Sequence, residues 1–157
     1  MIDQKDFWGP KLWKLMHTVS YFAPEELTNL QIREYHYFFT FVVTRCIMCI
    51  KCQIHYRKMI ERIQFDGITK NDLINYVIEL HNTVNRRLRK KQLTRNDVDI
   101  IYRNPNVYLR EIYDLLVWYK GNVQYGSFSK YNFKLLLLNI NKFLPKMEIK
   151  SEKKINV

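Results

Sequence analysis

Apolar residues recur every three or four positions along most of this chain, which is the spacing of one face of an α-helix. Only four glycines and four prolines occur among its 157 residues, which favours long helices over a many-stranded fold. The pattern predicts helices over about residues 10–23, 24–45, 49–63, 94–102, 107–119 and 129–144, and another that begins at Thr69 or Asn71. The last dozen residues read as a frayed tail. The sequence therefore predicts an all-α protein.

Proline and glycine set the expected ends of several helices. Pro10 is placed at the start of the first helix, and Pro24 stops it. The second helix is expected to begin at Pro24, because Glu25 and Glu26 suit the positive end of a helix dipole. A loop is expected around Gly121 and Gly126.

The net charge of +11 calls for an anionic partner. Nucleic acid, a phosphate-bearing cofactor, an acidic protein and a membrane surface all have that property. A hydrophobic content of 47% excludes wholesale disorder. No apolar run approaches the roughly 18 residues of a spanning helix, and the first residues lack the layout of a signal peptide. An odd cysteine count argues against a secreted disulfide scaffold, so we expect a reducing compartment.

All three cysteines lie in one short run, at Cys46, Cys49 and Cys52, with His55 three positions further on. On one continuous helix these four side chains would spread around the axis and could not converge on a tetrahedral metal ion. An iron–sulfur cluster would need a fourth cysteine. A redox dithiol of the Cys-x-x-Cys type and a set of buried, inert cysteines both remain open at this point.

Polar groups interrupt the apolar faces of two predicted helices. Gly9, Trp13 and His17 recur every four residues and share one face. Core packing would account for each of them singly. The second row is His81, Asn82 and Asn85, followed by the basic residues Arg86, Arg87, Arg89, Lys90, Lys91 and Arg95. Burying such a row without partners is costly, and a flat heteroaromatic ligand with phosphates near the cations would satisfy it.

Three motifs in this order resemble the Erv/ALR family of FAD-dependent sulfhydryl oxidases, especially the compact forms of large DNA viruses. They are Gly-x-x-x-Trp-x-x-x-His-Thr, Cys-x-x-Cys-x-x-His-Tyr and His-Asn-x-Val-Asn-Arg, within about residues 8–102. The resemblance implies a four-helix bundle with a short fifth helix cradling FAD, usually as a homodimer. It implies an oxidase domain over residues 1–104 and a helical extension with a frayed basic tail over residues 105–157.

The resemblance also implies roles for individual residues. Cys49 and Cys52 would be the catalytic pair, with Cys52 against the flavin and Cys49 exchanging with substrate. No metal is implied. The implied cofactor-binding residues are Gly9, Trp13, His17, Phe22, His55, His81, Asn82, Val84, Asn85, Arg86, Lys90 and Tyr102. Ile47 and Met48 stand where the family often has Tyr-Pro, and Cys46 is left over, without a partner for a separate shuttle pair.

The implied reaction passes electrons from thiols through the Cys49–Cys52 disulfide to FAD and then to molecular oxygen, giving hydrogen peroxide. Substrates would be thiol-containing proteins or a thioredoxin-like dithiol carrier. By resemblance to viral members, the chain would be a late viral protein of the host cytoplasm or virion, with nucleic acid not a partner. The alternative is a basic helical nucleic-acid or interaction module whose Cys/His run binds metal.

Overall fold

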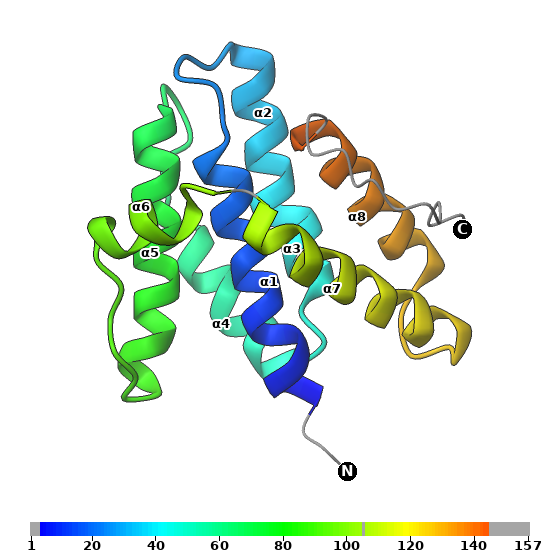
Figure 1. Cartoon of the computed structure of the whole chain (residues 1–157). Helices are drawn as coiled ribbons and strands as arrows, with labels where there is room; N and C mark the ends of the chain where they lie inside the picture. The colour runs from blue at the N-terminus through cyan, green and yellow to red at the C-terminus, as the bar shows by residue number, and fades with distance from the viewer. Residues whose placement is uncertain (1–3, 105, 145–157) are drawn as a thin grey trace.

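The computed structural model describes residues 4–104 and 106–144, and every regular element in them is helical. The bundle consists of α1 (Gln4–Tyr21), α4 (Ile50–Ile60), α5 (Lys70–Arg87) and a continuous helical rod that lies between α1 and α4 in the sequence. Three segments make up the rod: α2 (Asn29–Tyr37), the π-helical η1 (Phe38–Val42) and α3 (Val43–Cys46). The short fifth helix is α6 (Arg95–Tyr102), and the chain continues through α7 (Asn106–Gln124) and α8 (Lys130–Phe143). Figure 1 shows α1 at the centre of this arrangement. The predicted fold class is confirmed.

The first helix begins earlier than predicted, so that Pro10 lies inside α1 and not at its start. Proline removes one helical hydrogen bond, and packing of the preceding turns offsets that loss. Trp8 is buried, and the ring of Phe7 lies 6.2 Å from that of Trp118 in α7. Contact with a segment over a hundred residues away therefore extends this helix, which a local pattern does not reveal.

The predicted start of the second helix at Pro24 was wrong. The helix begins at Asn29, after a capping box. In this box the backbone N–H of Gln31 donates to the Thr28 hydroxyl, and the backbone N–H of Thr28 donates to the side-chain carbonyl of Gln31. The rod also widens into a π-helical segment where the backbone N–H of Val43 bonds the carbonyl of Phe38. Here the hydroxyl of Thr40 donates to the His36 carbonyl at 2.6 Å, a contact that disturbs regular helix geometry.

The predicted caps at Thr69 and Thr94 are both confirmed, each forming a capping box with the aspartate three residues on. Asn71, the other candidate start, lies inside α5. The loop expected at Gly121 was wrong, because α7 runs on to Gln124, whereas Gly126 has a φ of 73° and does lie in the turn before α8. The frayed tail lies outside the described residues.

The added helices α7 and α8 pack into the same core as the bundle. Ile112, Leu115 and Tyr119 of α7 are almost fully buried alongside Leu15 of α1, and Phe133 of α8 is buried with them. Helix α7 packs against α1, and α8 contacts η1 and α3. No helix among the described residues is both long and apolar enough to cross a membrane.

Candidate active site

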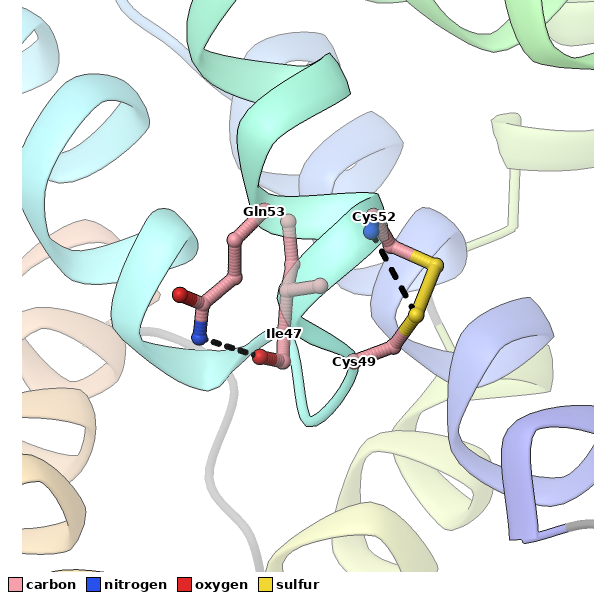
Figure 2. The surroundings of a disulfide bond; sticks show 4 residues. All are labelled: Ile47, Cys49, Cys52 and Gln53. Atoms are coloured by element: carbon pink, nitrogen blue, oxygen red, sulfur yellow. Dashed lines mark hydrogen bonds between the residues drawn. A yellow bond between two sulfur atoms is a disulfide. The ribbon is translucent and has the colours of Figure 1, made fainter.

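Cys49 and Cys52 form a disulfide at the start of α4 (Figure 2). The chain leaves α3 at Ile47, which has extended backbone angles, so the helix breaks between Cys46 and Cys49. Cys49 then caps α4, where its sulfur accepts a hydrogen bond from the Cys52 amide at 3.3 Å. The side chain of Gln53 donates to the Ile47 carbonyl at 2.6 Å and holds this turn in place. The positive end of the α4 dipole therefore lies at Cys49 and favours its thiolate.

The third cysteine is in a different environment. Cys46 is fully buried at the end of α3, and burial raises the pKa of its thiol to about 12. Its backbone carbonyl accepts a hydrogen bond from the Tyr119 hydroxyl of α7. A thiol with such a pKa stays protonated and is a poor nucleophile at neutral pH. The fold thus separates one inert thiol from the redox-capable pair.

A cleft opens beside Cys52, between α1, α4 and α5. Five of the predicted site residues line it, namely Gly9, Trp13, Cys52, His55 and Val84. Sequence reasoning missed other residues that line the same cleft: Leu12, Met16, Met59, Arg87 and Leu88. Leu12 and Met16 are one position before Trp13 and His17, so the helical spacing that selected those two residues also identifies this neighbouring stripe.

An aromatic row leads away from the cleft along α1, α5 and α6. Trp13 and His81 stack with ring centres 4.4 Å apart and planes 3° from parallel. The His81 Nδ1 atom is 3.0 Å from the Nε2 atom of His17, and the His17 ring stacks on Tyr102 with centres 5.1 Å apart. Phe22 does not join the row: it is 37% exposed and has its ring against Tyr21. Four of the predicted residues are thus brought together and Phe22 is not.

The two histidines of this row are uncharged at neutral pH. Burial, with a smaller contribution from His81, lowers the pKa of His17 to about 3. Burial and then the charge of Lys90 lower the pKa of His81 to about 4. The Nδ1 atom of His17 has no hydrogen-bond partner among the described residues, although it is fully buried. An unpaired buried nitrogen costs stability, so this position is suited to a ligand with a polar edge.

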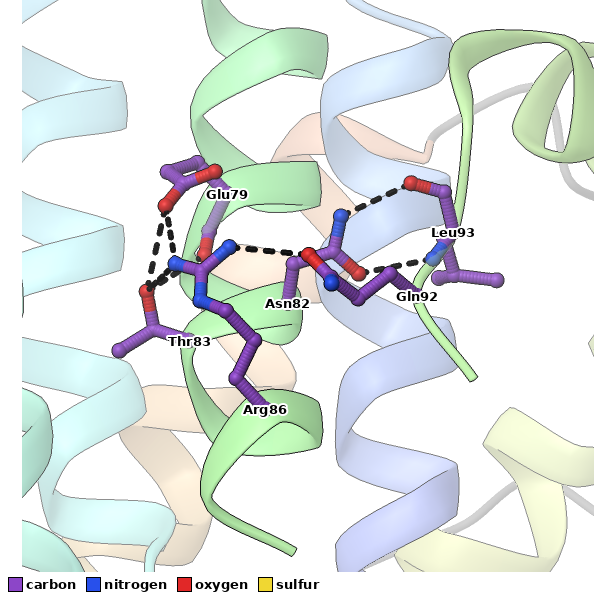
Figure 3. Close-up of polar contacts among 6 residues, drawn as sticks. All are labelled: Glu79, Asn82, Thr83, Arg86, Gln92 and Leu93. Carbon is purple, nitrogen blue, oxygen red and sulfur yellow. Dashed lines mark hydrogen bonds and ion pairs between the residues drawn. The ribbon is translucent and has the colours of Figure 1, made fainter. Parts of the chain in front are cut away.

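The last turns of α5 hold the loop that leads to α6 (Figure 3). The side-chain amide of Asn82 donates to the backbone carbonyl of Leu93 and accepts from the backbone N–H of Leu93, both at 2.8 Å. Arg86 is exposed and bonds Glu79, Thr83 and Gln92. The amides of Asn82 and the guanidinium of Arg86 are therefore engaged by the protein itself.

The two remaining predicted residues lie near the end of α5. Asn85 is buried, and its carbonyl accepts a hydrogen bond from the backbone N–H of Lys90 at 2.8 Å. The side chain of Lys90 is exposed. No group of three or more His, Cys, Asp or Glu residues in the described part of the chain is arranged to hold a metal ion. The metal-binding alternative also needs the thiols of Cys46, Cys49 and Cys52 as ligands, and in this structure Cys49 and Cys52 are joined in a disulfide.

The chain belongs to the Erv1 / Alr family, whose sequence model matches residues 10–103. This range includes the disulfide, most of the cleft and the aromatic row, and it ends just before α7. The chain is also similar to the FAD-linked sulfhydryl oxidase ERV1 of Arabidopsis thaliana, at 26% identity over 86 residues. That alignment covers 55% of this chain and 44% of the plant protein, so the chain spans less than half of its relative. No solved structure matches the chain.

Proposed function

We propose that this protein is an FAD-linked sulfhydryl oxidase that introduces disulfide bonds into protein substrates. The observation that carries the proposal is the Cys49–Cys52 disulfide, with Cys52 in the wall of a cleft that Trp13 and Val84 also line. A disulfide beside an aromatic cleft can exchange with thiols on one side and with a flat redox cofactor on the other. Family membership supports the same conclusion.

The exchange with substrate uses only the two cysteines. A substrate thiolate attacks the sulfur of Cys49, which breaks the disulfide and releases Cys52 as a thiolate. The second substrate thiolate then attacks the substrate sulfur of this mixed disulfide, and Cys49 leaves. The products are a substrate disulfide and two reduced cysteines, which hold the two electrons of the substrate thiols, while the two protons are exchanged through water. The α4 N-terminus stabilises the Cys49 thiolate as it leaves.

The cleft and the aromatic row fit the cofactor that this reaction requires. The unpaired Nδ1 atom of His17 and the apolar wall beside Cys52 suit a flat ring system with polar edges. Residues that would hold FAD are Gly9, Trp13, His55 and Val84 at the cleft, His17, His81 and Tyr102 along the row, Asn85 near the end of α5, and Lys90 near the phosphates. Bound FAD would supply a two-electron acceptor for the reduced cysteines and a route for those electrons to oxygen, so that two thiols and O2 would give one disulfide and H2O2.

We expect the substrates to be thiol-containing proteins or a thioredoxin-like dithiol carrier, and the protein to act as a homodimer. A late viral protein of the host cytoplasm or virion is the setting that the sequence motifs favour. None of these statements changes the chemistry at Cys49 and Cys52.

An absorption spectrum and an oxygen electrode test the proposal. The purified full-length chain, mixed with FAD and freed of excess, should show a protein-bound flavin spectrum. With dithiothreitol as substrate, it should consume oxygen and form peroxide in equal amounts. A chain that binds no flavin, or binds it and consumes no oxygen, would contradict the proposed activity.

A further inference from the structure

A second hollow lies directly beside the cleft at Cys52, between α4 and α5. This open groove has a volume of about 280 Å³, and three of the side chains along it are cations: Lys58, Arg62 and Arg87. We call it the cationic groove. Residues His55, Met59, Val84 and Arg87 line both the groove and the cleft, so the two are continuous.

The groove follows the same face of α4 as the disulfide. Cys52, His55, Met59 and Arg62 recur at steps of three or four residues, which places them in one line along α4 and the turn after it. A peptide that reacts at the start of this helix can therefore continue along it into the groove.

Lys58, Arg62 and Arg87 take part in none of the ion pairs among the described residues. The nearest acidic residue along α5, Glu79, is already paired with Arg86, and Glu61 is exposed at the end of α4. The groove thus has an excess of positive charge within reach of the reactive sulfurs. Such a surface attracts carboxylates, most strongly at low ionic strength.

We infer that the cationic groove binds an acidic segment of the protein substrate and so delivers the substrate cysteine to Cys49. This inference rests on the proposed function and specifies its substrate class. Cys49 and Lys58 are separated by nine positions of α4, or roughly 14 Å at 1.5 Å per residue. An extended peptide covers that distance in about four residues. Arg62, one turn further on, would be reached by a carboxylate about six residues from the substrate cysteine.

The test uses the FAD-loaded full-length chain and two dithiol peptides. One peptide carries aspartates four and six residues after its cysteine pair, and the other carries serines there. The variant is Lys58→Glu with Arg62→Glu, whose positions do not line the cleft at Cys52. The matched control is Lys130→Glu with Lys134→Glu, two exposed cations four residues apart on α8 that make the same change in net charge. A second variant, Lys58→Gln with Arg62→Gln, removes the groove charges without reversing them.

We expect the wild type and the α8 control to oxidise the acidic peptide with a kcat/KM about tenfold above that of the serine peptide at low salt. Both groove variants should lose this preference while oxidising dithiothreitol at the wild-type rate. A fluorescent acidic peptide with serines in place of its cysteines should bind the wild type, by anisotropy, and bind both groove variants at least several-fold more weakly.

Five results would overturn the inference. The preference could persist in the groove variants, or it could fall equally in the α8 control, which would indicate net charge alone. The groove variants could lose bound FAD, which would assign Lys58 and Arg62 to the cofactor. A single-stranded oligonucleotide could bind the groove more tightly than the acidic peptide. If the wild type oxidises dithiothreitol without any peptide preference, only this inference fails; if it binds no FAD and oxidises no dithiol, the proposed function fails with it.

Discussion

Asn82 and Leu93 are joined by two hydrogen bonds of 2.8 Å, in which the Asn82 side-chain amide pairs with both backbone groups of Leu93. This pairing fixes the loop between α5 and α6, as Figure 3 shows. Helix α6 follows directly, with its cap at Thr94, and it carries Tyr102 onto the ring of His17. One side chain of α5 therefore sets the position of an aromatic residue at the far end of the row.

Replacing Asn82 by Ala should lower the free energy of unfolding by about 2 kcal/mol, since two hydrogen bonds of a buried amide are lost. FAD should also dissociate more readily, because α6 is no longer held against His17. Asn82→Asp keeps the acceptor for the Leu93 amide and loses the donor, so we expect an intermediate loss of stability. Denaturant unfolding and flavin retention on gel filtration measure both effects. Wild-type stability in Asn82→Ala would contradict this role of the pair.

Arg89 should be replaceable by Gly with a gain in stability. It has a φ of 54° at the end of α5, a left-handed conformation that glycine adopts without steric cost. The turn is held by the Lys90 amide, which donates to the Asn85 carbonyl at 2.8 Å. We expect Arg89→Gly to raise the free energy of unfolding by roughly 1 kcal/mol, and Arg89→Ala to give no such gain. Equal shifts in the two variants would show that the backbone conformation is not the cause.

Acid should destabilise the FAD-free protein through His17 and His81. Their pKa values are lowered from 6.5 to about 3 and about 4 in the folded state, so below pH 6.5 the unfolded chain binds protons that the folded chain does not. The contribution of these two histidines to the free energy of unfolding is then fully present above pH 6.5. It falls as the pH is lowered, by up to about 1.4 kcal/mol per pH unit for each histidine.

Chemical denaturation between pH 7 and pH 4.5 measures this slope. His17→Gln should flatten it, because one of the two uncharged imidazoles is gone. An unfolding free energy that stays constant over this range in the wild type would contradict the assignment of two uncharged, buried rings.

Helix α7 should support the turn that carries the disulfide. The Tyr119 hydroxyl is buried and donates to the carbonyl of Cys46, three residues before Cys49. Tyr119→Phe leaves that carbonyl without its partner, and we expect the free energy of unfolding to fall by about 1–2 kcal/mol. Tyr131, which is 62% exposed on α8, provides the control, because Tyr131→Phe removes a hydroxyl from the surface. Equal stability of the two variants would indicate that α7 does not brace this turn.

Local sequence rules predicted the parts of the fold that depend on neighbouring residues. Thr69 with Asp72 and Thr94 with Asp97 form capping boxes within four residues, and Trp13 and His17 share a helical face at a spacing of four. These relationships are decided along one helix, so a pattern in the sequence contains them. The cleft beside Cys52 could be predicted in outline for the same reason.

Contacts between distant segments could not be read in this way. The pairing of the Asn82 side chain with Leu93 was not predicted, because it depends on how the chain returns after α5. The extension of α1 on the N-terminal side of Pro10 depends on contact with α7. Phe22 was assigned by motif position alone, whereas the end of α1 leaves it exposed.

Cys49 and Cys52 are the sulfurs that should exchange electrons with bound flavin, and Cys46 should not. The measurement is the loss of flavin absorbance after anaerobic mixing with dithiothreitol, in the wild type and in Cys46→Ser, Cys49→Ser and Cys52→Ser. We predict rapid bleaching in the wild type and in Cys46→Ser, and bleaching slower by about a hundredfold or more in Cys49→Ser and Cys52→Ser, although all four bind FAD. Wild-type bleaching in Cys52→Ser, or its loss in Cys46→Ser, would contradict the assignment of the Cys49–Cys52 pair.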